Sequence, residues 1–189
     1  MKRCPQTDSQ SVYEHGVSVK EHIFELIVFL RTGRPIDDGW RLPAWMHEYR
    51  EQLFASLLPI EVIDAYAVFH DCGKPYCLTI DEQGRRHFPN HPQVSHDTWK
   101  TVSENETIAN LILWDMKIHT MKAVDVDEFC QHREATTLLL AGLAEVHSNA
   151  KMFGGIESES FKIKWSQINK RGKAICLKLF GECHESSIG

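Results

Sequence analysis

The sequence lacks closely spaced cysteine pairs. Its six cysteines are scattered along 189 residues without a C-x-x-C motif or a regular spacing; they are Cys4, Cys72, Cys77, Cys130, Cys176 and Cys183. Zinc ribbons and disulfide-dense scaffolds both need repeated short spacings between cysteines. The distribution therefore excludes these two classes and predicts that the thiols are reduced.

Long apolar segments are also missing. The longest apolar runs are "IVFL" (27–30) and "TLLLAGLA" (137–144), whereas a membrane-spanning helix needs roughly 18 to 20 apolar residues. The first ten residues, "MKRCPQTDSQ", contain no apolar segment of the kind found in a secretory signal. We therefore expect no membrane partner and a cytoplasmic location.

The chain has no excess of positive charge. Lysine and arginine number 21 against 26 acidic residues, which gives a formal net charge of −5. This balance argues against a surface that coats nucleic acid or lipid. Histidine is abundant instead, since the chain has 11, and several stand beside acidic residues or within apolar periodicity.

Helical patterns dominate the first 150 residues, and they predict an all-α fold with one buried core. Ser18 and Glu21 have the spacing of a capping box at a helix start. The apolar positions that follow, together with His22, fall on one helical face until Gly33 and Pro35 end the pattern. This pattern predicts a helix that turns His22 toward the core.

A second helical pattern covers 51–75, with Pro59 near a helix start and Gly73 with Pro75 at the stop. Its last residues read "VFHDCGKP" and place His70 beside Asp71 at the helix end. The next segment, 76–95, is predicted as a loop with a short hairpin around "DEQG".

Two further helices are predicted in the second half of the chain. Ser103 and Glu106 repeat the capping-box spacing, and the following apolar stripe carries Asp115 and His119 one turn apart. Asp125 and Glu128 offer another helix start, after which "ATTLLLAGLAEVHSNA" is apolar nearly all round and therefore central.

The pattern of apolar and charged residues changes after the glycines at 154 and 155. The segments "FKIKW" (161–165) and "AICLKL" (174–179) alternate apolar and charged residues, with the basic "NKRGK" between them. This alternation predicts a small C-terminal β-hairpin. We expect a helical domain over 1–155 and a basic C-terminal extension over 156–189 that packs on it.

Several metal-binding residue types fall on predicted core faces or near them. They are His22, His70, Asp71, Asp115 and Glu145, with His91 and His96 in the loop and His119 beyond Asp115. Imidazole and carboxylate together suit Mn, Fe, Co, Ni or Zn better than Mg²⁺ or Ca²⁺. For Asp71, the simpler alternative is a structural ion pair with Lys74, and for His22 a hydrogen-bonded core position.

The motifs "SVKEH", "HDCGKP" and "FPNHPQVSH" resemble, in order, the signature of the HD superfamily of metal-dependent phosphohydrolases. They are most similar to the HD domain of bacterial CCA-adding tRNA nucleotidyltransferases. The resemblance covers roughly residues 12–150 and implies an HD-type helical bundle. It departs from the family at "WDMKIHT", where Asp115 replaces a histidine, and at "LAEVHSN", where Glu145 replaces an aspartate.

The resemblance implies metal ligands among His22, His70, Asp71, His91, Asp115 and Glu145, for one or two divalent transition-metal ions. Either Asp115 or Glu145 could complete the metal shell. With two ions, one would be held by His22, His70, Asp71 and Glu145, and the other by Asp71, His91 and Asp115.

The reaction that follows from such a centre is metal-assisted hydrolysis of a phosphoester or phosphoanhydride bond, with Asp71 at the centre. Lys74 is expected to meet a phosphate, or else to be a solvated charge at the helix end. His96 or His119 is expected to donate a proton to the leaving oxygen or to orient a ligand. The predicted substrate is a nucleotide or another phosphorylated small molecule.

The basic residues of the C-terminal extension widen the choice of partner to nucleic-acid ends. They are Lys162, Lys164, Lys170, Arg171, Lys173 and Lys178, and they form either a phosphate-binding surface or an ordinary solvated face. Two other functional classes stay open from the sequence: an HD-like di-iron oxygenase, and a non-catalytic module that binds nucleotide or nucleic acid.

Overall fold

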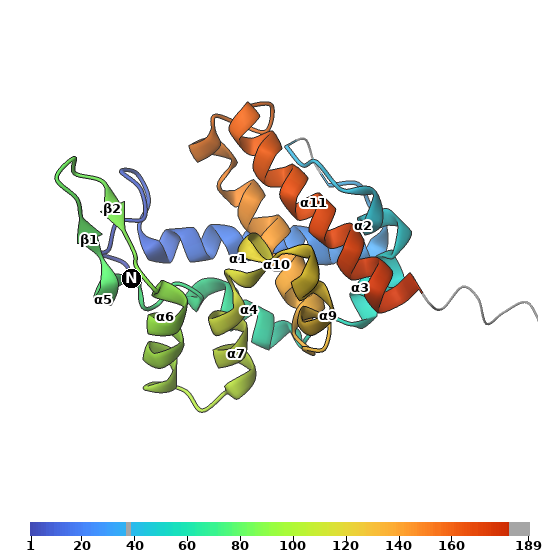
Figure 1. Ribbon diagram of the computed structural model, residues 1–189, viewed down its shortest axis with the longest axis horizontal. Helices are drawn as coiled ribbons and strands as arrows, with labels where there is room; N and C mark the ends of the chain where they lie inside the picture. The colour runs from blue at the N-terminus through green and yellow to red at the C-terminus, as the bar shows by residue number, and fades with distance from the viewer. Residues whose placement is uncertain (37–38, 182–189) are drawn as a thin grey trace, which may run out of the picture. The chain divides into compact units, whose positions relative to one another are not determined.

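The computed structural model describes residues 1–36 and 39–181, and these residues are mostly helical (Figure 1). The predicted all-α class is therefore confirmed. The chain divides into two compact units. The first combines Met1–Glu21 with Leu58–Met116, and the second combines His22–Leu57 with Lys117–Gly189. The division expected at residue 155 stays a prediction.

Helix α1 (Val12–Thr32) starts in the first unit and continues into the second. It begins six residues before the predicted Ser18, so that capping box is wrong: Ser18 lies within the helix. The real box joins Ser11 and Glu14, because the Glu14 carboxylate accepts from the Ser11 amide at 2.7 Å and the Ser11 hydroxyl accepts from the Glu14 amide at 3.2 Å. The predicted end is confirmed, since Gly33 follows the helix with φ of 68°.

The first unit is a helical core with a small hairpin on it (Figure 1). Its elements are α4 (Ile60–Phe69), α5 (Lys74–Cys77), β1 (Thr79–Ile80), β2 (Arg86–His87), α6 (His91–Lys100) and α7 (Glu106–Trp114). Helix α7 packs on α4 and α6, and α6 also packs on α5. The predicted hairpin around "DEQG" is confirmed, with Thr79 paired to His87 and Ile80 to Arg86.

Three boundaries in this unit differ from expectation. Helix α6 starts at His91, inside the predicted loop, where Asn90 adopts the left-handed conformation that precedes it. The N-cap of α7 is Asn105, whose side chain accepts from the Ile108 amide, and not Ser103. Helix α7 ends at Trp114, so Asp115 and His119 do not share one helix.

The second unit contains the rest of α1, the long helix α11 and a set of shorter helices that includes α10 (Figure 1). Its other elements are α2 (Ala44–Glu48), α3 (Arg50–Ala55), α8 (Lys117–Thr120), η1 (Ala123–Asp125), α9 (Val126–Phe129), α10 (Ala135–Ser148), η2 (Ala150–Phe153) and α11 (Glu159–Phe180). The expected central helix is confirmed, because nearly every residue of α10 is buried. Asp125 directly precedes α9, but its carboxylate accepts from the Lys122 amide and does not cap that helix.

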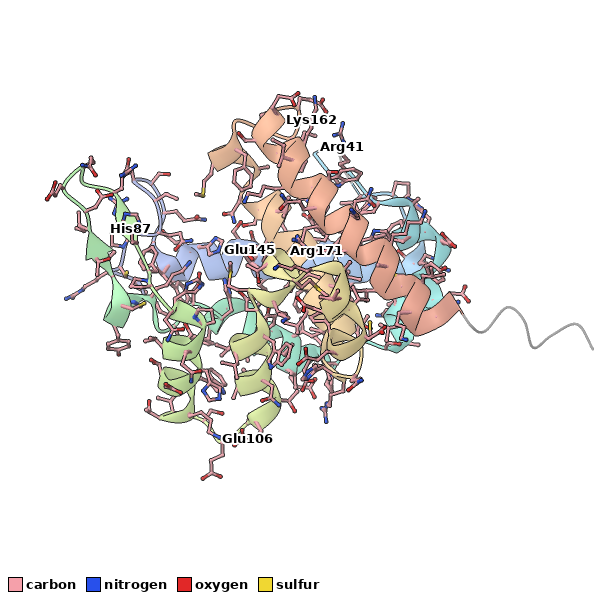
Figure 2. All side chains as sticks on the ribbon, viewed as in Figure 1. Arg41, His87, Glu106, Glu145, Lys162 and Arg171 are labelled. Carbon is pink, nitrogen blue, oxygen red and sulfur yellow. The ribbon has the colours of Figure 1, made fainter. Side chains whose placement is uncertain are left out.

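The predicted C-terminal hairpin is wrong, because α11 covers both expected strands. Its buried residues Phe161, Ile168, Gly172 and Ile175 recur at helical spacing. The helix packs on α10, α9, α8 and α2. Ser158 caps its start by accepting from the Phe161 amide at 3.2 Å. Figure 2 shows Lys162 near the start of this helix and Arg171 farther along it. None of the described helices is both long and apolar enough to cross a membrane.

Candidate metal centre

The centre of the first unit is the His70–Asp71 pair, which directly follows α4. Both side chains are almost fully buried, with relative exposures of 3% for His70 and 1% for Asp71. The pair therefore lies at the end of a core helix, as predicted, and turns polar atoms into the interior. Buried polar groups of this kind need partners that offset their lost hydration.

Three imidazoles surround the Asp71 carboxylate. The Nε2 atoms of His70 and His15 lie 3.2 and 3.8 Å from Oδ2, and Nε2 of His91 lies 3.6 Å from Oδ1. The His15 and His70 rings meet edge to face, with centroids 5.4 Å apart. Four chemical groups from α1, the end of α4 and the start of α6 thus converge within one unit.

The backbone fixes the ring orientation of two of these histidines. Nδ1 of His70 lies 2.8 Å from the Ala67 carbonyl, and Nδ1 of His91 lies 3.1 Å from the Phe88 carbonyl. A carbonyl oxygen only accepts, so each Nδ1 donates and Nε2 is the ring nitrogen that faces Asp71. A metal ion that takes the place of a proton on Nε2 would bind there, as in histidines whose other ring nitrogen donates to a carbonyl.

Two glycines allow the backbones to approach closely enough for this convergence. A side chain on Gly16 would place Cβ 2.3 Å from the Val68 carbonyl oxygen. The helices α1 and α4 can therefore approach this closely only because residue 16 has no side chain. A Cβ on Gly73 would lie 2.3 Å from the Ser95 amide nitrogen. Gly73 has φ of −83°, so it is needed for this contact with α6 and not for ending a helix.

Gly73 and Pro75 therefore do not end α4, as the sequence suggested. Helix α4 already ends at Phe69, and the two residues stand at the start of α5. The Gly73 amide donates to the Ser95 hydroxyl at 2.9 Å, and the Cys72 thiol donates to the Ser95 carbonyl at 3.3 Å. These bonds attach the Asp71 turn to α6.

Asp71 is held in its ionised form. Burial acts to raise its pKa and is the largest single influence, but the positive charges of His70, Lys74 and His15 together outweigh it. The pKa of Asp71 is therefore well below its ordinary value. A buried carboxylate that stays ionised is a strong anchor for a cation.

Lys74 is the nearest cationic group. Its Nζ lies 2.5 Å from Asp71 Oδ2, donates to Gln6 Oε1 at 3.1 Å, and sits 5.1 Å from the centre of the Phe88 ring. At 7% exposure it is not the solvated charge considered as one alternative. The ion pair with Asp71, the other alternative, is present in the structure.

Asp115 and His96 are also in the first unit. Asp115 is 8% exposed and accepts a short hydrogen bond from the Tyr66 hydroxyl, and the Tyr66 ring lies 6.2 Å from that of His70. His96 lies on α6 and contacts the neighbouring Asp97, with Nδ1 2.8 Å from Oδ1. Asp115 thus borders the cluster through Tyr66, whereas the contacts of His96 with Gln93 and Asp97 lie along its own helix.

The remaining predicted residues belong to the second unit. His22 is partly buried there, with its ring 5.5 Å from that of Trp40. His119 and Glu145 contact each other, with Nε2 and Oε2 2.9 Å apart. Each unit therefore brings some of the predicted site residues together.

His15 was missed in the sequence, although it is fully buried and lies beside Asp71. A signal was present: His15 is three residues after Val12 and four before Val19, two buried residues on the same helical face. The misplaced helix start at Ser18 left this face out of the predicted helix.

The first-unit residues fit a divalent transition metal by their chemistry. Three imidazoles and an ionised carboxylate face one another, and this mixed nitrogen and oxygen set is typical of sites for Zn, Mn, Fe, Co or Ni. The Nδ1 hydrogen bonds of His70 and His91 to backbone carbonyls leave Nε2 as the nitrogen that can coordinate a metal.

Comparison with protein-family models, with curated proteins and with solved structures finds no match to this chain. The functional conclusion therefore depends on the residues themselves.

Proposed function

We propose that the protein is a metal-dependent phosphohydrolase that acts on a nucleotide or a small phosphoester. The observation that carries this proposal is the convergence of His15, His70 and His91 on the ionised carboxylate of Asp71, at 3.2–3.8 Å. The ordered likeness of "HDCGKP" and "FPNHPQVSH" to the HD superfamily supports the same reaction class.

Asp71, His70, His91 and His15 would hold the metal in the first unit. When bound, a divalent ion of this type lowers the pKa of a water molecule and neutralises phosphoryl oxygens. Asp71 contributes the negative charge, while the Ala67 and Phe88 carbonyls keep the His70 and His91 rings aligned. His22, Asp115 and Glu145 as further ligands stay predictions.

Lys74 contributes positive charge beside Asp71 and can meet an anionic phosphoryl group. Its ion pair with Asp71 holds the ammonium group at the cluster, and the contact with Gln6 adds a second anchor. His96 and His119 as proton donors stay predictions. The substrate class covers phosphomonoesters, nucleoside triphosphates and cyclic phosphodiesters.

A substrate panel tests the proposal. Hydrolysis of these three classes would be measured with Mn²⁺, Co²⁺, Ni²⁺, Zn²⁺ or Fe²⁺ for the wild type, for Asp71→Asn and for Asp64→Asn. Asp64 is a matched control because it lies on α4 and pairs with Lys20 at the surface. We expect metal-dependent turnover that Asp71→Asn reduces by at least a hundredfold and Asp64→Asn leaves within about twofold.

Equal turnover in the wild type and Asp71→Asn would overturn the proposal. Oxygen consumption by the iron-loaded protein without any hydrolysis would favour an HD-like di-iron oxygenase. Ligand binding without either reaction would favour a non-catalytic module.

A further inference from the structure

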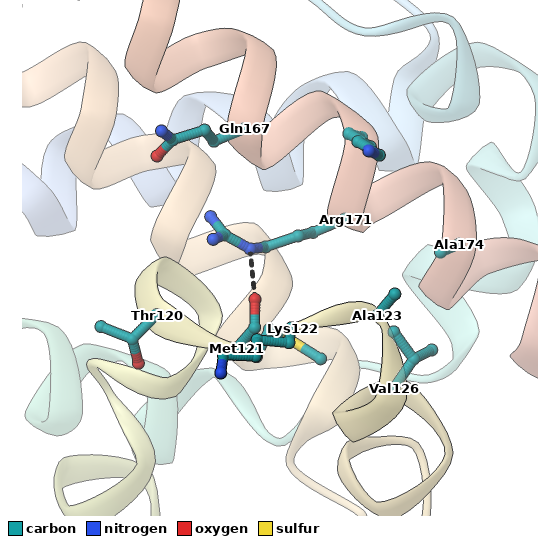
Figure 3. A pocket seen from close by; sticks show the side chains of 9 residues that line it. Thr120, Met121, Lys122, Ala123, Val126, Gln167, Arg171 and Ala174 are labelled. Atoms are coloured by element: carbon teal, nitrogen blue, oxygen red, sulfur yellow. Dashed lines mark hydrogen bonds between the residues drawn. The ribbon is translucent and has the colours of Figure 1, made fainter.

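A cavity lies in the second unit, between α11 and the segment 120–126 (Figure 3). Its volume is about 400 Å³, within the range of pockets that bind small molecules. It is lined by Thr120, Met121, Lys122, Ala123, Val126, Gln167, Lys170, Arg171 and Ala174. All of these residues belong to one unit and none was assigned to the candidate metal centre.

Arg171 is the central group of this cavity. Its Nε donates to the Met121 carbonyl at 3.0 Å, and Figure 3 shows the guanidinium extended from α11 toward that carbonyl. Nη1 is buried and has no hydrogen-bond partner among residues 1–36 and 39–181. Burial lowers the pKa of Arg171 because it removes water from the charged group. An arginine remains protonated in proteins, so this half-buried guanidinium can receive an anion at Nη1.

The surrounding charges do not supply one. Lys122 and Lys170 also line the cavity, and no carboxylate does among the described residues. The nearby acids are engaged elsewhere: Asp125 accepts from the Lys122 amide and pairs with Lys117, while Asp127 pairs with Lys178. The cavity therefore combines uncompensated positive charge with an apolar wall.

The apolar wall consists of Met121, Ala123, Val126 and Ala174. A planar guanidinium with a fixed Nε matches the oxygens of a phosphate, and two lysines add charge without demanding a fixed geometry. The apolar side chains would then contact a nonpolar part of the same ligand. Inorganic phosphate alone would leave this wall uncovered.

We propose that this cavity binds a phosphate group carried on a small apolar or aromatic body, with Arg171 as the principal anion contact. The cavity is a binding site distinct in composition from the histidine cluster around Asp71. Its ligand can be a substrate-like molecule or an unrelated effector, since the shared chemistry is the phosphate and the apolar body.

The probe is phenylphosphonate, whose carbon–phosphorus bond a phosphohydrolase does not cleave. Binding to the full chain would be measured by calorimetry, beside inorganic phosphate and benzyl alcohol. We expect phenylphosphonate to bind more tightly than either. We also expect Arg171→Gln to weaken it at least tenfold, and Lys173→Gln, an exposed cation of α11 outside the cavity lining, to change it less than threefold.

A second variant separates loss of the site from loss of the fold. Ala174 is exposed, so Ala174→Trp fills the cavity from the surface without removing a charge, and we expect it to abolish binding while thermal unfolding stays cooperative. Asp71→Asn should leave binding unchanged. The proposal is overturned if the wild type does not bind phenylphosphonate, if Arg171→Gln and Ala174→Trp both bind it normally, or if Asp71→Asn abolishes binding.

Discussion

At the scale of single residues, the ion pair of Asp71 and Lys74 has large energetic consequences because it is buried. Both side chains are buried, with exposures of 1% and 7%, and their charged atoms lie 2.5 Å apart. Removing one partner of a buried pair leaves a desolvated charge and typically costs about 3–5 kcal/mol. Removing both avoids that penalty.

A double-mutant cycle tests this coupling. We expect Asp71→Asn and Lys74→Met each to lower the free energy of unfolding by about 3 kcal/mol in metal-free buffer. The double variant should lose at least 1 kcal/mol less than the sum of the two. Urea denaturation followed by circular dichroism gives all three values. Additive losses would show that the two charges do not stabilise each other.

His147 is a second buried polar residue, in the other unit, and its role is structural. Its Nδ1 lies 2.9 Å from the Leu143 carbonyl, its Nε2 accepts from the Arg41 amide at 3.1 Å, and the Trp40 ring stacks on it. Acceptance at Nε2 requires a neutral ring. Burial lowers the pKa of His147 from 6.5 to about 4, so the folded protein keeps it neutral.

Stability should therefore fall as the pH drops through this interval. Between pH 6.5 and about 4 the unfolded chain binds a proton at His147 that the folded chain does not. The resulting loss in the free energy of unfolding is absent above pH 6.5 and amounts to about 3 kcal/mol below pH 4. Urea denaturation at several pH values should show a shallower decline for His147→Gln than for the wild type.

His47→Gln is the control, because His47 is an exposed histidine of the same unit. It should keep the pH dependence of the wild type. An unchanged slope in His147→Gln would contradict the neutral, buried assignment of His147.

The residues of the candidate site differ in how far the sequence alone could predict them. His70, Asp71 and His91 follow from short local motifs, and the structure brings them together. The roles of Gly16 and Gly73 depend on which helices touch, through the contacts of Gly16 with Val68 and of Gly73 with Ser95. Such long-range contacts leave no periodic signal in a single sequence.

At the scale of elements, α11 shows how a short alternating pattern can mislead. Within 161–165 the apolar residues recur at every second position, as in a strand. Over the whole segment the buried residues recur at intervals of seven, four and three residues, from Phe161 through Ile168 and Gly172 to Ile175. A window of five residues is too short to separate the two periods.

The start of α11 gives an element-scale prediction. Ser158 accepts from the Phe161 amide at 3.2 Å, so Ser158→Ala removes the cap and should lower the free energy of unfolding by about 1 kcal/mol. Ser166→Ala, at an exposed position within the same helix, should not destabilise the protein. Chemical denaturation compares the two. Equal losses would mean that the cap contributes nothing specific.

Helix starts were the least predictable elements elsewhere too. The spacing Ser-x-x-Glu occurs at 11–14, 18–21 and 103–106, and only the first is a capping box in the structure. At α7 the Asn105 side chain caps the helix in place of Ser103. The long, strongly apolar α10 was predictable because its burial on nearly all sides needs no boundary signal.

At the scale of the whole molecule, we expect the proposed metal binding by the cluster around Asp71 to stabilise the folded state. A ligand that binds only the folded state stabilises it, by about 2.7 kcal/mol at a concentration of one hundred times its Kd. For a chain of this length that corresponds to a rise in Tm of roughly 5–10 °C. Such a rise would support binding but would not locate the ion.

Calorimetric titration of Mn²⁺ into the metal-free wild type and variants locates the bound ion. We expect at least one ion bound per wild-type chain, no binding by Asp71→Asn, and affinity at least tenfold weaker in His15→Gln. Asp64→Asn should bind as the wild type does. Equal Mn²⁺ affinity in the wild type and Asp71→Asn, or no binding by the wild type, would contradict the metal centre.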